Sequence, residues 1–159
     1  QRIVNAKEID PGAFSDRLVM ESDPHRLIEG MAIAAYAIGS SNAILYLKAG
    51  SEHARAGIQN AIEQARDYGL LGHNIHSSGY NLDIVVRMEP GAFVCGEETA
   101  LINSLEGKRG MPQLKPPYPT TAGLAGKPTV INNVETFMNV RLIKPVSYTH
   151  LTLPTTPSV

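Results

Sequence analysis

Apolar segments of strand length alternate with segments of helical period through the first ninety residues, and this alternation restricts the fold most. Arg2–Ala6 and Ala43–Leu47 are short, compact apolar runs that are typical of strands. A third predicted strand has an apolar residue at every second position: Leu82, Ile84, Val86 and Met88. The residues between them include Asp83 and Arg87, so this strand is expected to be half-buried.

Two amphipathic helices are predicted between these strands. The first begins at Ser22-Asp23-Pro24, where a capping side chain precedes a proline in the first turn, and it ends at Gly39. The second covers residues 51–68 and ends at Gly69. Its apolar face is formed by Ala54, Ile58, Ala61, Ile62 and Ala65. Strands that alternate with helices predict an α/β layered domain whose sheet is at least partly parallel.

The pattern changes after Glu89. A short apolar strand at Phe93-Val94, a tight turn and a helix that begins with Glu97 and Glu98 are predicted next. A loop rich in Gly, Pro and basic residues follows over 107–126, and loops of this length in compact domains are usually functional. A last helix is predicted to begin at 132 and to continue towards residue 143.

Composition excludes several classes of function. With 159 residues, 43% of them hydrophobic, the chain is long enough for one domain with a substantial core. The net charge of −1 argues against nucleic-acid binding and against attraction to an anionic membrane. No window contains the roughly 20 apolar residues that span a bilayer. The single cysteine, Cys95, excludes an internal disulfide and favours a reducing, cytoplasmic compartment.

The two ends of the chain lead to two further expectations. Gln1 is not a start methionine, and no basic segment with an apolar run follows it, so no signal peptide is expected. Residues 145–159 contain threonines and prolines but no charged residue, and 146–155 resemble one translated frame of a transposon-end sequencing adapter. We therefore expect a domain over 1–144 and a non-native tail over 145–159, the alternative being a native Pro/Thr-rich linker.

The acidic turn at Glu97 and Glu98 has two interpretations. Carboxylates in the first turn of a helix interact favourably with its free N–H groups without any ligand. Alternatively, because Gly96 precedes them at a strand-to-helix turn, a ligand could approach the backbone and donate hydroxyl groups to the two carboxylates.

Asn132 and Asn133 have a similar pair of interpretations. One of them could be a helix cap, or both could face the polar edge of a flavin ring, since asparagine side chains both donate and accept hydrogen bonds. Cys95 is expected to be a small buried side chain without a basic neighbour. His73 and His76 are expected in a solvated loop rather than in a metal site.

The basic residues of the 107–126 loop leave two possibilities open. Lys108, Arg109 and Lys115 either form a solvated surface or contact phosphates or a partner subunit. Nothing in their spacing decides between these possibilities.

Residues 91–101, Gly-Ala-Phe-Val-Cys-Gly-Glu-Glu-Thr-Ala-Leu, resemble the signature of the NADH- and flavin-binding subunit of respiratory complex I. They are equally similar to the corresponding subunits of NAD(P)-linked hydrogenases and formate dehydrogenases. The similarity continues in order through 10–17, 106–110, 114–119 and 132–136, and it covers essentially all of 2–144.

This resemblance implies a Rossmann-like α/β domain that binds FMN, with the domain incomplete at both ends. In the family, NADH delivers a hydride to FMN, which then passes single electrons to an iron–sulfur cluster. Asp10 and Phe93 would lie near the nicotinamide, and Glu98 would face NADH. Seven positions would line FMN: Asn5, Glu8, Gly96, Glu97, Asn132, Asn133 and Thr136.

The resemblance also implies cofactors and partners outside this chain. A 4Fe-4S cluster is expected from a four-cysteine motif after Lys144, and a glycine-rich phosphate loop is expected before Gln1. The partners would be the iron–sulfur subunits of a redox complex, with no direct membrane insertion of this chain and at most a peripheral place at the inner membrane. The choice between NADH and NADPH stays open, and the fragment alone is expected to be inactive.

Three positions depart from the family pattern. Lys7 stands where the family usually has an acid, Ile9 replaces a glycine, and Glu89-Pro90 replaces Gly-Ala. These departures motivate an alternative function, namely a degenerate homologue that keeps the fold for assembly but binds no flavin.

Overall fold

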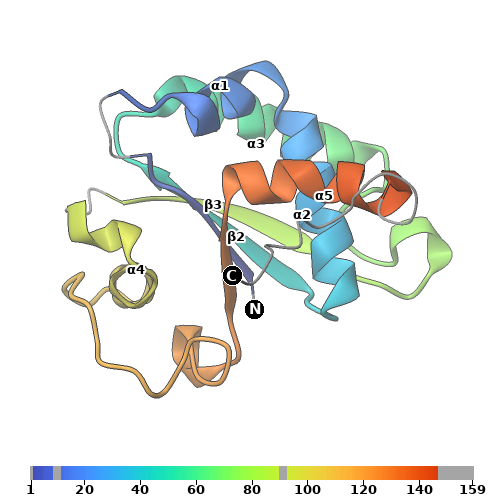
Figure 1. Ribbon diagram of the computed structural model, residues 1–159. Coiled ribbons are helices and arrows are strands. Elements are labelled where there is room, and N and C mark those ends of the chain that lie inside the picture. Colours follow the sequence, from blue (N-terminus) through green and yellow to red (C-terminus); the bar gives the residue numbers. More distant parts are fainter. Residues whose placement is uncertain (1, 9–11, 90–92, 147–159) are drawn as a thin grey trace, which may run out of the picture.

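Four parallel strands form a single sheet at the centre of the molecule. The computed structural model describes residues 2–8, 12–89 and 93–146. The strands are β1 (Arg2–Ala6), β2 (Asn42–Lys48), β3 (Asp83–Glu89) and β4 (Val130–Asn133), in the order β3-β2-β1-β4 (Figure 1). Every strand pair is parallel. The expected α/β class with a parallel sheet is therefore confirmed.

Helices cover the two faces of this sheet unequally. Four helices lie on one face: α1 (Ser15–Ser22), α2 (Pro24–Ala37), α3 (Glu52–Asp67) and α5 (Val134–Val146). The other face carries the short helix α4 (Glu98–Leu105), which follows a 3-10 turn, η2 (Phe93–Gly96). Two further 3-10 turns are η1 (Ile75–Ser77) and η3 (Leu124–Gly126).

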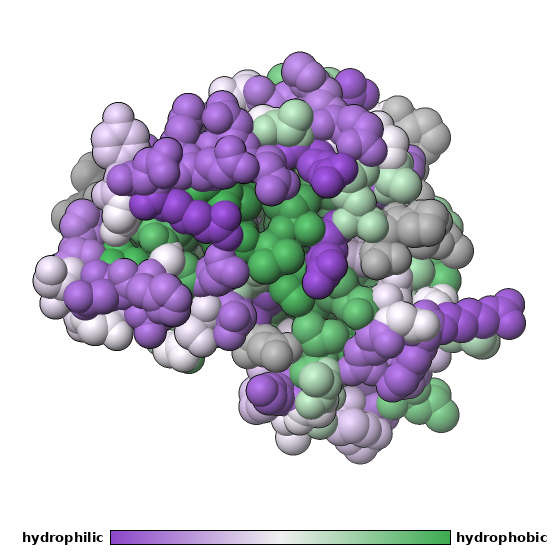
Figure 2. Space-filling view, turned by 180° about the vertical axis from the view of Figure 1, so that it is seen from behind, coloured by the Kyte–Doolittle hydropathy of each residue, from purple (hydrophilic) through white to green (hydrophobic). Residues whose placement is uncertain are grey.

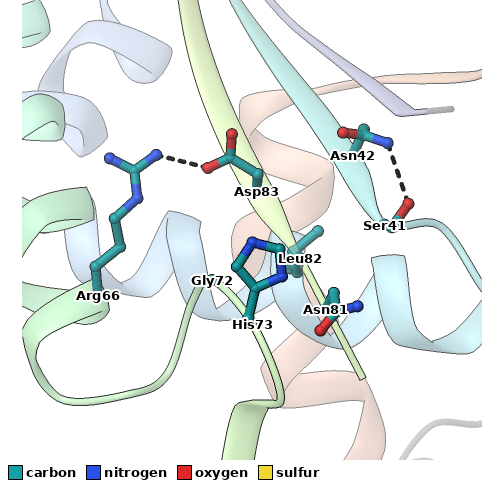
Figure 3. Close-up of a pocket in the computed structure, with 8 residues that line it drawn as sticks. All are labelled: Ser41, Asn42, Arg66, Gly72, His73, Asn81, Leu82 and Asp83. Carbon is teal, nitrogen blue, oxygen red and sulfur yellow. Dashed lines mark hydrogen bonds and ion pairs between the residues drawn. The ribbon is translucent and has the colours of Figure 1, made fainter. Parts of the chain in front are cut away.

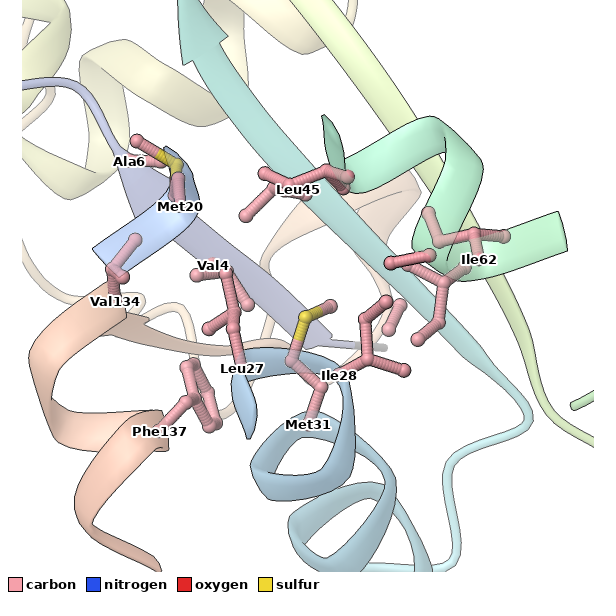
Figure 4. Close-up of a cluster of buried hydrophobic side chains, with 14 of the residues drawn as sticks. Val4, Ala6, Met20, Leu27, Ile28, Met31, Leu45, Ile62, Val134 and Phe137 are labelled. Carbon is pink, nitrogen blue, oxygen red and sulfur yellow. The ribbon is translucent and has the colours of Figure 1, made fainter. Parts of the chain in front are cut away.

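The main apolar core lies between the sheet and the four-helix layer (Figure 4). Val4 and Leu45 from the strands pack there against Leu27 and Met31 of α2 and Phe137 of α5, and each is at most 1% exposed. Burial of such side chains is worth about 1.5–3 kcal/mol each. The core therefore fixes the sheet against this helix layer.

A smaller core lies beneath α4. It consists of Ile3 and Tyr46 from the sheet with Leu101 and Ile102 from α4. The Tyr46 hydroxyl lies 3.1 Å from the Ser104 Oγ of α4. Figure 2 shows hydrophobic surface across the middle of the molecule's reverse face, bordered by hydrophilic side chains. The α4 layer thus relies on fewer apolar contacts than the layer opposite.

Helices α2 and α5 approach each other closely at Gly30. A Cβ atom at Gly30 would lie 1.9 Å from the backbone oxygen of Phe137, which no real Cβ contact tolerates. Gly30 is itself buried, so a glycine is required for the two helices to pack at this separation.

Several predicted elements are confirmed. The three early strands, the helix capped by Asp23 and the helix over 52–67 all form, and the five predicted apolar residues of the latter are its buried residues. Asp23 accepts a hydrogen bond from the backbone N–H of Arg26 at 3.2 Å. Gly69 follows α3 with a φ of +70°, as a helix-ending glycine should.

Other expectations are wrong. Phe93-Val94 is not a strand but part of the 3-10 turn η2, because this apolar pair is too short to make a ladder. The last helix begins at Val134 rather than at 132, because Asn132 and Asn133 end a strand, β4, that was not predicted. Helix α1 was also missed. The 107–126 loop ends in η3.

The strand order places a topological switch point between β1 and β4. The chain moves outward from β1 through β2 to β3 and then returns to the opposite side of β1 as β4. In open α/β sheets, ligands bind at the carboxyl ends of the strands beside such a switch point. This edge is therefore the first place to look for a binding site.

Candidate functional site

Two asparagines meet at the carboxyl ends of β1 and β4. Asn5 and Asn133 are direct partners in the parallel register, so they lie on the same face of the sheet. Ile3, two residues before Asn5, packs under α4, which identifies this as the α4 face. The Asn5 Nδ2 donates to the Gly96 carbonyl oxygen at 3.1 Å. The structure therefore brings Asn5, Asn133 and Gly96 together at the switch point.

Glu97 is the N-cap of α4. Its Oε2 accepts hydrogen bonds from the backbone N–H groups of Thr99 and Ala100, at 2.9 and 3.0 Å, and from the Thr99 hydroxyl at 2.5 Å. Burial alone would raise the pKa of Glu97. The hydrogen bonds and the nearby Lys115 together lower it by more, so the pKa lies below its ordinary value. The helix-cap interpretation therefore holds for one oxygen, Oε2, and does not involve Oε1.

Glu98 begins α4 and pairs with a lysine from the long loop. The Lys115 Nζ contacts the Glu98 Oε1 and lies 3.6 Å from the Glu97 Oε1. The hydrogen bond to Glu98 is the main cause of the raised pKa of Lys115. Lys115 is thus paired with the acidic turn while it stays exposed to solvent, and Lys108 pairs with Glu106 at 2.7 Å.

Glu8 follows β1 and caps helix α1. Its carboxylate accepts from the backbone N–H groups of Asp16 and Arg17, both at 3.2 Å, and from the Ser15 hydroxyl at 3.4 Å. Asp16 continues this connection, because its carboxylate accepts a backbone hydrogen bond from Glu135 at the start of α5. Burial raises the pKa of Asp16 to about 6, and the charges of Glu8 and Glu135 act in the same direction.

Lys7 is buried at the end of β1, with 7% of its surface exposed. Burial lowers the pKa of its amine, the nearby Cys95 opposes that shift, and Lys48 adds to it. Cys95 is a buried thiol, as expected, but the expectation that it has no basic neighbour is wrong. Lys7 and Cys95 are 88 positions apart in the chain, so local sequence patterns do not predict that they are close.

The remaining predicted residues lie around this edge with different exposure. Phe93 is 78% exposed at the start of η2, and Thr136 is exposed in the first turn of α5. Asn132 is half-buried and pairs with Val4 in the register. Asp10, as well as Ile9 and Pro90 among the departures, lies outside the described residues.

Two buried polar residues of α4 were not recognised from the sequence. Thr99 and Asn103 are 7% and 6% exposed, and both bind the 107–126 loop. Their spacing of four places them on one helix face, beside apolar residues. Polar residues at i and i+4 within a buried helix face are the signal that could have identified them.

A cavity of about 630 Å³ lies at the opposite, amino edge of the sheet (Figure 3). Asn42 and Asp83, at the starts of β2 and β3, line it together with His73 from the preceding loop. Arg66 of α3 and Asp83 form an ion pair at 2.6 Å there, so this guanidinium is already matched. The cavity brings together none of the predicted site residues.

The described residues include neither a membrane-spanning helix nor a metal-binding cluster. No helix among them is long and apolar enough to cross a membrane. Within the same ranges, no three His, Cys, Asp or Glu residues form a group that could hold a metal ion.

The family described as "Nuo51 FMN-binding domain" matches residues 2–142. The chain belongs to this family. It is 55% identical over 141 residues to the F subunit of the NADH-quinone oxidoreductase of Aquifex aeolicus, a match that covers 89% of this chain and 33% of that protein. It is 52% identical, also over 141 residues, to the NADP-reducing hydrogenase subunit HndC of Solidesulfovibrio fructosivorans, with 89% and 29% coverage.

A solved structure of a relative agrees in fold. The crystal structure of an NAD+-reducing [NiFe]-hydrogenase in the H2-reduced state matches with a TM-score of 0.85 and 39% identity, over 96% of this chain and 26% of that chain. The chain spans between about a quarter and a third of the length of the relatives named here. The resemblance to complex I and hydrogenase flavin subunits is confirmed.

Proposed function

We propose that this protein binds FMN at the carboxyl edge of β1 and β4 and serves as part of the flavin subunit of an NAD(P)H oxidoreductase. The observation that supports this most strongly is the in-register pair Asn5 and Asn133 beside Gly96, at the switch point of a parallel sheet. Membership of a family described as an FMN-binding domain supports FMN as the ligand.

The donor set at this edge suits the flavin. The pyrimidine edge of a flavin offers carbonyl oxygens and an N–H, and the amide of Asn133 would supply both donors and an acceptor on the α4 face. Asn132, in register with Val4, would add its amide from the other face of β4. Gly96 has no side chain to block the approach of a ligand to the backbone. Because Glu97 accepts its three hydrogen bonds on Oε2, its Oε1 carries no capping bond and could accept from a ligand hydroxyl beside the Lys115 amino group, which lies 3.6 Å away. Bound FMN would accept a hydride from NAD(P)H and release single electrons.

The other predicted residues receive roles by the same resemblance. Thr136 and Glu8 would line FMN, Thr136 with a hydroxyl near the asparagines and Glu8 from its place after β1, where its carboxylate also caps α1. Glu98, Phe93 and Asp10 would contact the nicotinamide dinucleotide. Phe93 is exposed enough to meet a planar ligand.

The proposal extends to the parts of the protein beyond the sheet. Electrons would leave for a 4Fe-4S cluster held outside the described residues, and the partners would be iron–sulfur subunits of a cytoplasmic redox complex. The names of the relatives, which are subunits of an NADH-quinone oxidoreductase and of a hydrogenase, support this assembly. We also propose that residues 1–144 belong to the FMN-binding domain and that 145–159 are not native to it.

A flavin titration tests the proposal. The protein would be produced at the full length of its relatives, mixed with FMN, and then reduced with NADH under anaerobic conditions. We expect a yellow complex that NADH bleaches, with weaker FMN binding in Asn133→Ala and unchanged binding in Asn139→Ala. Asn139 is the matched control, since within the described part of the chain its amide donates to the Glu135 carbonyl oxygen of its own helix. A folded protein that takes up no flavin would establish the structural homologue instead.

The role of Glu98 has its own test. Glu98→Ala should leave FMN bound but weaken NADH binding, because it removes the carboxylate that faces the dinucleotide. Kinetic constants equal to those of the wild-type protein would refute this role.

A further inference from the structure

The loop that carries Lys115 is held by buried polar groups of α4. The Asn103 Nδ2 donates to the Met111 carbonyl oxygen at 2.7 Å, and its Oδ1 accepts from the Gln113 Nε2 at 3.1 Å. The backbone oxygen of Asn103 accepts from the Lys108 N–H at 2.9 Å. One residue of α4 therefore binds the loop at three points.

Thr99, one helical turn before Asn103, also binds the loop. Its hydroxyl oxygen accepts from the Gln113 backbone N–H at 2.8 Å and donates to the Glu97 Oε2. Gln113 is thus held through both its backbone and its side chain. We call Thr99, Asn103 and Gln113 the α4 clasp.

The loop also packs closely against the buried Cys95, next to the clasp. A Cβ atom at Gly110 would lie 2.3 Å from the Cys95 Sγ, so the loop lies directly on the buried thiol. Two residues beyond Gln113, the Lys115 amino group reaches Glu98, which immediately precedes Thr99 in the chain. The clasp therefore connects the two segments that carry this ion pair.

The ion pair does not hold the loop in place by itself. Lys115 and Glu98 side chains are 30% and 38% exposed, and solvent-exposed ion pairs contribute little because water screens them. Thr99 and Asn103 are themselves buried, and their hydrogen bonds to the loop are partly shielded from water, so leaving these donors and acceptors unpaired is unfavourable. The clasp, whose hydrogen bonds are less exposed than the ion pair, therefore sets the position of Lys115.

We propose that Asn103 is a positioning residue for nicotinamide-dinucleotide binding, because it fixes the loop so that the Lys115 amino group stays opposite Glu98. This inference rests on the proposed function, in which Glu98 faces NADH. Asn103 itself touches no ligand in this scheme. Its effect passes through Gln113 to Lys115.

The test uses the full-length, FMN-loaded protein with NADH and a small artificial electron acceptor. Asn103→Ala and Gln113→Ala should each raise the KM for NADH about tenfold while kcat and flavin content change less than about twofold. Gln113 is exposed, so its variant keeps the test valid if Asn103→Ala fails to fold. Asn139→Ala is the matched control and should leave all three quantities unchanged.

A double-variant cycle separates positioning from a general structural effect. If Asn103 acts through Lys115, then Asn103→Ala adds almost nothing to the KM effect of Lys115→Met. Additive effects, or an unchanged KM in folded and flavin-loaded Gln113→Ala, would overturn the proposal. If the wild-type protein binds no FMN, the proposed function falls and this inference falls with it. If the flavin-loaded wild-type protein oxidises NADH and the Asn103→Ala and Gln113→Ala variants have the same KM for NADH as the wild type, this inference alone is overturned.

Discussion

The two faces of the sheet are covered by different chemistry. On one face, four helices enclose a large apolar core in which side chains such as Leu27 and Phe137 are almost fully buried. On the other, α4 rests on a small apolar cluster and is joined to the 107–126 loop by hydrogen bonds in which Asn103 donates and Thr99 and Glu106 accept. Apolar packing is non-directional, whereas hydrogen bonds fix the direction of each group. The first face therefore stabilises the fold, and the second orients the candidate site.

The largest effect is expected at the contact between α2 and α5. Gly30→Ala would place a methyl group 1.9 Å from the Phe137 backbone oxygen, and neither helix backbone is free to yield. We expect a loss of about 3 kcal/mol or more in the free energy of unfolding, measured by urea denaturation. Gly57→Ala in α3 is the control, since its Cβ would meet its nearest neighbour at 3.6 Å. The control should stabilise by about 0.5–1 kcal/mol through helix propensity.

An intermediate effect is expected on the α4 face. Thr99→Val keeps the side-chain shape but removes the hydroxyl that accepts from Gln113 and donates to Glu97. We expect a loss of about 2 kcal/mol, together with faster hydrogen exchange in the loop than in the strands. Thr121→Val, at an exposed site, should change neither quantity. Equal exchange rates in loop and strands would show that the two faces unfold as one unit.

The smallest effect concerns pH on the four-helix face. The pKa of Asp16 is raised to about 6, so the folded state binds a proton more tightly than the unfolded state. Stability should therefore fall as pH rises from about 4 to 6. Asp16→Asn keeps an acceptor for the Glu135 N–H, so it should remove this dependence and gain on the order of 1 kcal/mol at pH 7, after allowance for solvent screening.

The opposite dependence is expected at Glu97 on the α4 face. Its pKa is lowered in the folded state, so its contribution is present above the ordinary value near 4.5 and is lost as pH falls through the folded pKa. Urea denaturation at a series of pH values below about 4.5 should show that Glu97→Gln loses less stability on acidification than the wild-type protein does. An unchanged acid limb would contradict the assigned capping role.

Sequence patterns predicted the four-helix face better than the α4 face. The five buried residues of α3 follow directly from a 3.6-residue period, and β2 from a compact apolar run. Strand β4 was missed because Asn132 and Asn133 are polar and the strand has four residues. The motif residues Asn5, Gly96 and Asn133 were identified, but their meeting depends on the strand order, which local patterns do not encode. The burial of Lys7 beside Cys95 likewise depends on tertiary contacts.

The two opposite edges of the sheet are the alternative places for a flavin, and hydrogen exchange with and without FMN distinguishes them most directly. The measurement would compare amide exchange across the full-length protein in the two states. We predict protection at the carboxyl edge, in segments 5–8, 93–98 and 130–136, and none around Arg66, His73 and Asp83 at the amino-edge cavity. Protection at the amino-edge cavity, or no protection at either edge, would contradict the assignment of the flavin to the switch point of this sheet.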